Sequence, residues 1–347
     1  MGASGKQGVP DDVTGATTTD RARAIASWRA RRSFLAEDFP LGRLLAAKRA
    51  SVSVVLPARE EAATVGTIVA TVAELRDRGL IDEVVVVDAA SGDGTARVAA
   101  AAGARVVQED SIHPELGPTR GKGDAMWRGL TVTTGEVVVY LDADTADFDP
   151  RFVLGLLGPV LCDPDIDFVK GTFARPLRRG PEILAGEGGR VTELVARPLL
   201  NLYAPALGVF DQPLAGELAV RRGLLERLPF SVGYGVEIAM LIDAWREVGL
   251  DRLAQVDLGT RQNRHQSLRA LSAMAYAVIV AAGRRFHPEA MDDGSPEPGV
   301  LALPPLDPAG SMELRPVATE ERPPLRSLAL VGEAGRRPDG VSGGVRR

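Results

Sequence analysis

Cysteine is nearly absent from this 347-residue chain, which has only Cys162. One cysteine cannot form an intrachain disulfide, so the fold must depend on its apolar core, and such a chain suits a reducing compartment. Residues 1–20 contain no apolar h-region, and no run of about 18 apolar residues occurs anywhere. We therefore predict a cytoplasmic protein without a signal peptide or membrane span.

An excess of positive charge is also missing, since the net charge is −5. This argues against a broad nucleic-acid surface, which needs clustered cations. Lysine occurs at only four positions, Lys6, Lys48, Lys122 and Lys170. One pocket needs only a few cations, so a small anionic substrate fits the composition.

The apolar residues, 45% of the chain, are arranged as in an α/β protein. Nearly continuous apolar runs at 51–57, 82–88 and 135–144 are typical of strands buried on both faces, and 60–75 has helical spacing. Further strands are expected at 104–107, 167–176, within 213–230 and within 251–268. Further helices are expected at 187–207, 235–250 and about 269–285. This alternation predicts a mainly parallel sheet with flanking helices.

The composition divides the chain into five segments. We expect a disordered tail at 1–20, a helical segment at 21–50 and an α/β core at 51–150 and 151–287. Residues 288–347 are rich in Pro, Gly and charge, which predicts a mostly disordered tail.

The strongest local signal is Asp142-Ala143-Asp144, directly after an apolar strand. Carboxylates at the carboxyl edge of a parallel sheet lie where ligands bind, and they can hold a divalent ion that also binds a diphosphate. A solvated acidic turn is the alternative. The placement of the motif favours the metal site.

Four other segments carry weaker signals. Pro57-Ala58-Arg59-Glu60-Glu61 and the turn after Asp88 follow strands that point to a nucleotide site, but helix capping also explains the acidic residues. Gly121-Lys122-Gly123 opens a helix and suits an anion, as does Gly188-Gly189-Arg190-Val191-Thr192. For the segment that contains Arg190, an ordinary surface arginine is the simpler interpretation.

Together these segments resemble the glucosyl-3-phosphoglycerate synthases of actinobacteria over about residues 45–285. The resemblance is carried by VVLPAREE, the acidic turn after VVVVD, GKGDAMWRGL, VVVYLDAD, FVKGTFARP, GGRVTELVARPLLNLYAPALG, QPLAGELAVRR, PFSVGYGVEIAMLID and QVDLGTR. It implies a GT-A fold, a homodimer, a UDP-glucose donor, a 3-phospho-D-glycerate acceptor, Mg²⁺ (or Mn²⁺ or Co²⁺), and retention of anomeric configuration. Within the core, it implies that 51–150 is the nucleotide-sugar-binding half and that 151–287 is the acceptor-binding half with closing helices.

The resemblance also implies roles for individual residues. Donor binding falls to Pro57, Ala58, Arg59, Glu61, Ala89, Lys122, Asp142, Ala143, Leu214, Tyr234, Glu237 and Arg261. Acceptor binding falls to Gly189, Arg190, Val191, Thr192 and Asn263, and the catalytic group comprises Glu237, Asp144 and Arg261.

Two positions depart from the family pattern. Ala89 stands where the family often has a serine, which removes one hydroxyl contact. Asn263 stands where a metal-binding histidine is expected, and His265 follows two residues later. The metal ligands are therefore Asp144 with Asn263 or His265, of which we favour His265.

The mechanism predicted from these residues places a metal on the diphosphate and the acceptor hydroxyl beside the anomeric carbon. Alternatives are a mannosyl-3-phosphoglycerate synthase that uses GDP-mannose and a polyprenyl-phosphate glycosyltransferase. The absence of an apolar anchor disfavours the latter. A nucleotidyltransferase would need a Gly-rich basic loop after the first strand, which PAREEAATVG lacks.

Overall fold

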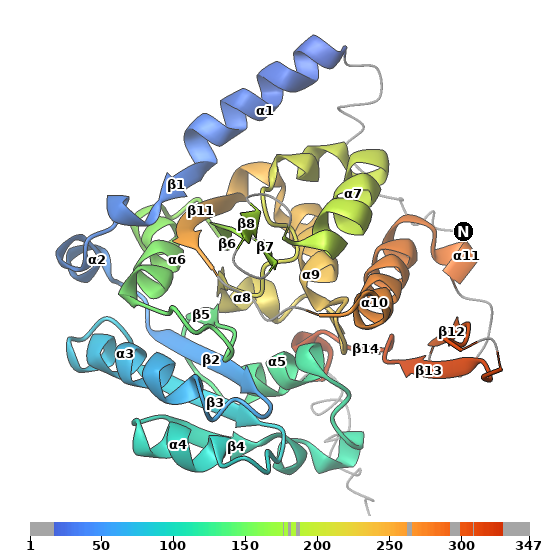
Figure 1. The fold of residues 1–347 in the computed structure, drawn as a ribbon. Helices are drawn as coiled ribbons and strands as arrows, with labels where there is room; N and C mark the ends of the chain where they lie inside the picture. The colour runs from blue at the N-terminus through green and yellow to red at the C-terminus, as the bar shows by residue number, and fades with distance from the viewer. Residues whose placement is uncertain are drawn as a thin grey trace, which may run out of the picture.

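The computed structural model describes residues 17–175, 177–179, 182–184, 188–261, 266–291, 299–307 and 309–328. An eight-stranded sheet with the order β1-β11-β6-β9-β5-β2-β3-β4 forms its centre (Figure 1). Every neighbouring pair is parallel except those made by β9, which runs antiparallel to β5 and β6. The strands are Ser33–Leu35 (β1), Val52–Ala58 (β2), Glu83–Asp88 (β3), Arg105–Gln108 (β4), Val137–Tyr140 (β5), Phe168–Ala174 (β6), Leu218–Arg221 (β9) and Leu253–Thr260 (β11).

The central strands are buried on both faces, as their valine runs predict. Val55 of β2 joins the core on one side of the sheet, and Val54 joins the core on the other side. Helices α5 (Lys122–Thr131), α7 (Arg197–Tyr203), α9 (Val236–Val248) and α10 (Leu268–Phe286) supply the first core, and α2 (Leu41–Ala47), α3 (Val65–Asp77) and α6 (Pro150–Cys162) supply the second. The sheet is thus the middle of three layers, which confirms the mainly parallel α/β prediction.

The remaining elements are short, apart from α1. They are α1 (Thr18–Arg32), α4 (Thr95–Ala101), α8 (Arg222–Leu225), α11 (Pro288–Met291) and the strands β7 (Leu177–Arg179), β8 (Glu182–Leu184) and β10 (Phe230–Ser231). Short 3-10 helices lie at η1 (Ala36–Asp38), η2 (Glu109–Ser111), η3 (Pro114–Leu116), η5 (Pro205–Val209) and η6 (Leu250–Arg252). Within the described residues, no helix combines the length and apolarity that a membrane crossing requires.

The segment 21–50 is not helical throughout, which corrects the prediction. Helix α1 ends at Arg32, and β1 pairs in parallel with β11, Ser33 facing Gln255. The Gln255 Nε2 donates a hydrogen bond to the Ser33 Oγ over 3.0 Å. Without β1, the outer backbone groups of β11 would lack partners, so three residues are enough to complete the sheet edge.

The segment 187–207 is also interrupted. A π-helical turn (η4, Thr192–Ala196) precedes α7, where the prediction has one continuous helix. Pro198 has no N–H to donate to the carbonyl of Leu194, so the regular helical ladder cannot pass through this point.

The C-terminal segment is folded over much of its length, which corrects the prediction of a mostly disordered tail for residues 299–307 and 309–328. Strands β12 (Gly299–Leu303) and β13 (Glu313–Val317) form a hairpin, and β14 (Glu321–Arg322) pairs with β10. The Trp127 indole of α5 donates to the carbonyl of Pro323 over 2.9 Å. We call residues 313–328 the C-terminal strap. Residues 292–298 and 329–347 lie outside the described residues.

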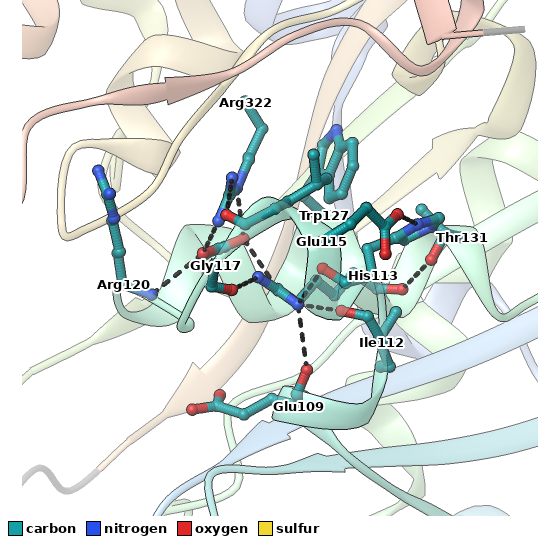
Figure 2. A network of polar contacts seen from close by, with 12 residues as sticks. Glu109, Ile112, His113, Glu115, Gly117, Arg120, Trp127, Thr131 and Arg322 are labelled. Atoms are coloured by element: carbon teal, nitrogen blue, oxygen red, sulfur yellow. Dashed lines mark hydrogen bonds and ion pairs between the residues drawn. The ribbon is translucent and has the colours of Figure 1, made fainter. Parts of the chain in front are cut away.

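A buried ionic network fastens the strap to α5 (Figure 2). Asp124 is fully buried, and it accepts hydrogen bonds from Arg128 at 3.3 Å and from Arg322 at 2.7 Å. Arg128 also donates to the carbonyls of Ile112 and Gly117, which holds the loop 109–117 over the helix. This network fixes the first turn of α5, where Lys122 lies.

Candidate active site

Three carboxylates and two cations meet at the carboxyl ends of the parallel strands. Asp142 and Asp144 follow β5, and Arg261 follows β11. The Arg261 guanidinium donates to Asp142 Oδ2 over 2.9 Å, to Asp144 Oδ1 over 2.6 Å and to Glu217, which directly precedes β9. The Lys122 Nζ donates to Asp142 Oδ1 over 2.5 Å. We call these five residues the charge cluster.

Glu237 extends the charge cluster onto α9. Its Oε1 accepts a hydrogen bond from Lys122 Nζ over 2.8 Å, so Lys122 bridges Asp142 and Glu237. Glu237 lies in the first turn of α9, where the helix dipole favours a negative charge. It is 6% exposed, so its carboxylate is fixed in place.

The charges of the cluster are stabilised by one another. Burial alone would raise the pKa of Asp142, but Lys122 and Arg261 hold that pKa below its usual range. Burial likewise opposes the charged form of Arg261, yet Glu217 and Asp142 raise its pKa. Asp142 and Arg261 therefore keep their charges at neutral pH, whereas burial raises the pKa of Glu217 although Arg261 opposes that shift. The arrangement is suited to a polyanionic ligand and its counterion.

Gly216 leaves space for the cluster. A Cβ at this position would collide with Lys122 Nζ and with Asp142 Oδ1. The Gly216 backbone thus lies directly against the ion pair, and any side chain would displace it.

A pocket of about 350 Å³ opens beside Lys122. Six of the predicted donor-site residues line it, namely Pro57, Ala58, Arg59, Ala89, Lys122 and Tyr234. The Thr119 hydroxyl, also in its lining, is buried without a hydrogen-bond partner among the described residues. An orphaned polar atom in an open pocket indicates that a ligand supplies the missing bond.

The strap supplies part of the pocket wall. Pro316, Val317 and Ala318 line it together with Ala273 and Ala277 of α10. Sequence analysis missed the three strap residues because it assigned 288–347 to a tail. Glu109 also lines the pocket, and Figure 2 shows its carboxylate pointing away from the Arg128 network.

The other six predicted donor residues lie outside the pocket lining. Asp142, Arg261 and Glu237 belong to the ionic contacts around Lys122, and the remaining three lie elsewhere. Ala143 is 4% exposed and belongs to the core, and its carbonyl accepts from Thr64 Oγ1 over 2.6 Å. The Glu61 backbone N–H donates to Thr95 Oγ1, and Leu214 packs against the core. Their roles in donor binding remain predictions.

The predicted acceptor residues form a tight turn at the start of η4. Gly189 has a φ of +69°, which favours glycine, and the turn continues into the helix through Arg190. Arg190 Nη2 donates to the carbonyl of Gln266 over 2.7 Å, while Val191 and Thr192 are buried. Asn263 and His265, the remaining acceptor and metal candidates, lie outside the described residues.

Asp144 fits a divalent metal ion. Its side chain is 36% exposed, and Arg261 is its one ion-pair partner within the described residues, which leaves carboxylate capacity for a cation. The same described ranges contain no group of three His, Cys, Asp or Glu side chains that could hold a metal. Asp144 is therefore a carboxylate that the described residues offer to a divalent ion.

Glu217 is a member of the charge cluster that sequence analysis missed. It is 1% exposed and contacts Arg261 from the position just before β9, the strand between β5 and β6. The signal was present as a lone acidic residue at the start of an apolar strand, in AGELAV. A carboxylate there must be paired, because an isolated buried charge is too costly.

Comparison with known proteins identifies the family. Residues 53–178 match the family model described as Glycosyl transferase family 2. The chain is 41% identical to a glucosyl-3-phosphoglycerate synthase of Mycolicibacterium paratuberculosis, covering 87% of this chain and 92% of the relative. It is 43% identical to that of Mycobacterium tuberculosis, covering 83% and 89%. The chain belongs to the glucosyl-3-phosphoglycerate synthase family. It is a hexosyltransferase with the GT-A type of α/β fold.

Solved structures agree with this membership. The glucosyl-3-phosphoglycerate synthase of M. tuberculosis in complex with Mn²⁺, UDP-glucose and phosphoglyceric acid matches with a TM-score of 0.72 at 42% identity, covering 84% of this chain and 95% of that one. A mannosyl-3-phosphoglycerate synthase from Rubrobacter xylanophilus matches with a TM-score of 0.77 at 45% identity, covering 87% and 99%.

Proposed function

We propose that this chain transfers glucose from UDP-glucose to 3-phospho-D-glycerate and forms glucosyl-3-phosphoglycerate with retention of configuration. The observation that carries the proposal is the charge cluster beside the pocket lined by Pro57, Ala58 and Lys122. It places two cations and a candidate metal ligand beside a cavity of nucleotide dimensions. The relatives that bind UDP-glucose and phosphoglyceric acid support the substrates.

In this proposal the nucleoside occupies the pocket and the diphosphate reaches the charge cluster. Lys122 and Arg261 face the diphosphate and neutralise charge as the nucleotide departs. Lys122 also holds Glu237 over 2.8 Å, which orients that carboxylate toward the hydroxyls of the sugar. A divalent ion bound through Asp144, Mg²⁺ or Mn²⁺, would supply Lewis-acid stabilisation of the leaving diphosphate.

Retention is proposed to follow a front-face route, in which the acceptor hydroxyl attacks from the side of the departing nucleotide. A double displacement needs a free carboxylate near the anomeric carbon. Within the described residues, Asp142, Glu217 and Glu237 are each paired with a cation. A trapped covalent glucosyl adduct on this chain would contradict the front-face route.

Acceptor-dependent release of UDP tests the proposal. Purified protein is mixed with UDP-glucose and Mg²⁺, with and without 3-phosphoglycerate, and EDTA is added in parallel. We expect release that requires the acceptor and stops with EDTA. If no nucleotide sugar gives UDP or GDP release that depends on the acceptor, the transferase assignment with these substrates is refuted.

Mannosyl transfer from GDP-mannose is the second candidate. It is favoured by the R. xylanophilus mannosyl-3-phosphoglycerate synthase, which is 45% identical to this chain. GDP-mannose in the same assay separates the two. We expect kcat/KM to be higher for UDP-glucose, and a higher value for GDP-mannose would replace the glucosyl assignment with the mannosyl one.

A homodimer is part of the proposal. Leu194 of η4 is 74% exposed and Leu202 of α7 is 69% exposed, and exposed large apolar side chains of this kind suit contact with a second copy. Light scattering at several concentrations checks the mass, and a monomer throughout would contradict the dimer.

A further inference from the structure

Arg175 is a cation without an acidic partner at the edge of the site. It follows β6 directly, and Arg261 follows the neighbouring strand β11. Its Nε is fully buried, and no described residue accepts a hydrogen bond from it. Among the described residues no carboxylate lies within ion-pair distance of Arg175, whereas Arg261 has three such partners.

The surroundings of Arg175 oppose its charge. Burial lowers the pKa of Arg175, and the charge of Arg261 lowers it further, although Glu217 and Asp142 act in the opposite direction. Its guanidinium carbon lies 4.7 Å from the centre of the Phe173 ring, which Arg261 also faces at 5.4 Å. A cation–π contact offsets only part of the cost of a buried charge.

Arg175 also contacts the turn predicted to hold the acceptor. Its carbonyl accepts from the Gly188 N–H over 3.1 Å. Its Cδ would lie 3.9 Å from a Cβ at Gly189, about as close as the Thr192 hydroxyl would. The side chain therefore lies close to the Gly188–Gly189 turn, and it shares the Phe173 ring with Arg261 of the charge cluster.

We propose that Arg175 binds an oxyanion of the acceptor, the carboxylate or the phosphate of 3-phosphoglycerate, where the Gly189–Thr192 turn meets the charge cluster. This inference rests on the proposed function. An incoming anion would supply the hydrogen-bond acceptors that Arg175 lacks, because a guanidinium pairs with carboxylate and phosphate through two parallel N–H groups. Arg175 is thus an acceptor-binding residue that the family resemblance did not assign.

The test is the variant Arg175→Gln, measured with three acceptors. We expect the KM for 3-phosphoglycerate to rise about 10- to 100-fold, the range for loss of a charge-assisted hydrogen bond. The dissociation constant of UDP with Mg²⁺ should change less than about 3-fold. Arg175→Lys should recover part of the loss because it keeps the charge. A general folding defect would impair UDP binding equally.

The analogues distinguish the two oxyanions. Glycerol 3-phosphate lacks the carboxylate, and glycerate lacks the phosphate. If Arg175 binds the carboxylate, the substitution leaves the KM for glycerol 3-phosphate unchanged, and if it binds the phosphate, the KM for glycerate is the one unchanged. Either pattern supports the proposal.

The matched control is Arg49→Gln. Arg49 is exposed just before β2, at the opposite end of the sheet from the charge cluster, and the substitution changes the net charge equally. Equal 3-phosphoglycerate KM values for Arg175→Gln and Arg49→Gln would overturn the proposal. So would a loss confined to UDP binding, which would assign Arg175 to the donor diphosphate.

Titration with inorganic phosphate separates this proposal from the proposed function. If the wild-type protein does not turn over 3-phosphoglycerate, the function is wrong, yet Arg175 as an oxyanion ligand is still tested. Glycerate is titrated in parallel to cover the carboxylate. Weaker binding of phosphate or of glycerate by Arg175→Gln than by Arg49→Gln would support the oxyanion site, and equal binding of both anions by the two variants would refute it.

Discussion

The charge cluster and the acceptor turn differ in how their cations are balanced. In the cluster, Lys122 and Arg261 are paired with carboxylates at 2.5 to 2.9 Å. At the turn, Arg190 donates to a carbonyl, and Arg175 has no acidic partner among the described residues. Buried charges must be compensated, by the protein or by a ligand. The cluster is therefore a framework that exists before binding, and the turn is a site that an anion completes.

The largest effect is expected for Arg261→Met. The change leaves Glu217 and Asp142 without their shared cation, and removing one partner of a buried pair costs about 3–5 kcal/mol of unfolding free energy. We also expect kcat/KM to fall roughly 1,000-fold, because a cation facing the diphosphate is lost. Urea unfolding measures the loss of stability, and the rate of UDP release measures the loss of kcat/KM.

Arg252→Met is the control for that variant. It removes an arginine bonded to Asp167 at 2.5 Å, but the side chain is 39% exposed, so we expect a loss of about 1 kcal/mol or less. Equal destabilisation by Arg261→Met and Arg252→Met would show that burial does not determine the cost of removing an ion-paired arginine from this protein.

The second prediction concerns the C-terminal strap. Arg322→Ala removes one of the two cations that neutralise the fully buried Asp124, so we expect about 2–4 kcal/mol of destabilisation. UDP binding should weaken several-fold as the wall at Pro316–Ala318 loosens. Urea unfolding measures the destabilisation, and isothermal titration measures the affinity for UDP. Arg326→Ala, an exposed change in the same strap, should alter neither.

The third prediction uses Gly216→Ala. The new methyl group collides with Lys122 Nζ and Asp142 Oδ1, which forces the ion pair apart. Overpacking of this kind costs about 1–3 kcal/mol. We expect kcat to fall by more than the loss of stability, measured as a lower melting temperature, would explain. Gly223→Ala, where a Cβ has open space, is the control, and comparable activities for the two variants would contradict the packing argument.

The smallest effect is expected from Glu109→Gln. Burial, together with Asp110 and Asp124, raises the pKa of Glu109 to about 7, although Arg128 and Arg59 oppose the shift. A raised folded-state pKa means that the folded protein binds the proton more tightly than the unfolded chain does. This contribution to stability is full below about pH 4.5 and is lost as pH rises to about 7. In Glu109→Gln, the free energy of unfolding measured with urea should decline less steeply between about pH 4.5 and pH 7 than in the wild-type protein. The same pH dependence in both proteins would refute the prediction.

Much of the fold follows from the sequence because the signals are local. The runs at 51–57 and 82–88 read as buried strands, and Asp142 and Asp144 lie at the strand end as expected. Strand β1 was missed because three residues carry no periodicity, and it forms only because the edge of β11 needs a partner. The strap was missed because its composition resembles a tail, while its anchors, Asp124 and Trp127, lie far away in sequence.

The candidate site was predictable only in part for the same reason. Motifs identify Lys122, Asp144 and Arg261, but not the ion pairs that hold them. Those pairs join the ends of five elements, which are α5, β5, β9, α9 and β11. Glu217 and Arg175 lie in the family segments QPLAGELAVRR and FVKGTFARP, but the resemblance assigns neither of them a role. Only burial and pairing in the folded protein identify Glu217 as a neutralised acid and Arg175 as a cation without an acidic partner among the described residues.

A crystal structure of the protein with UDP-glucose, a divalent metal ion and 3-phosphoglycerate tests the central claim most directly. The account predicts the base in the pocket beside Pro57 and Ala58, the diphosphate at Lys122 and Arg261, and the acceptor's anionic groups at Gly189–Thr192 and Arg175. Nucleotide bound away from this pocket, or an acceptor that leaves Arg175 without an anionic partner, would contradict it.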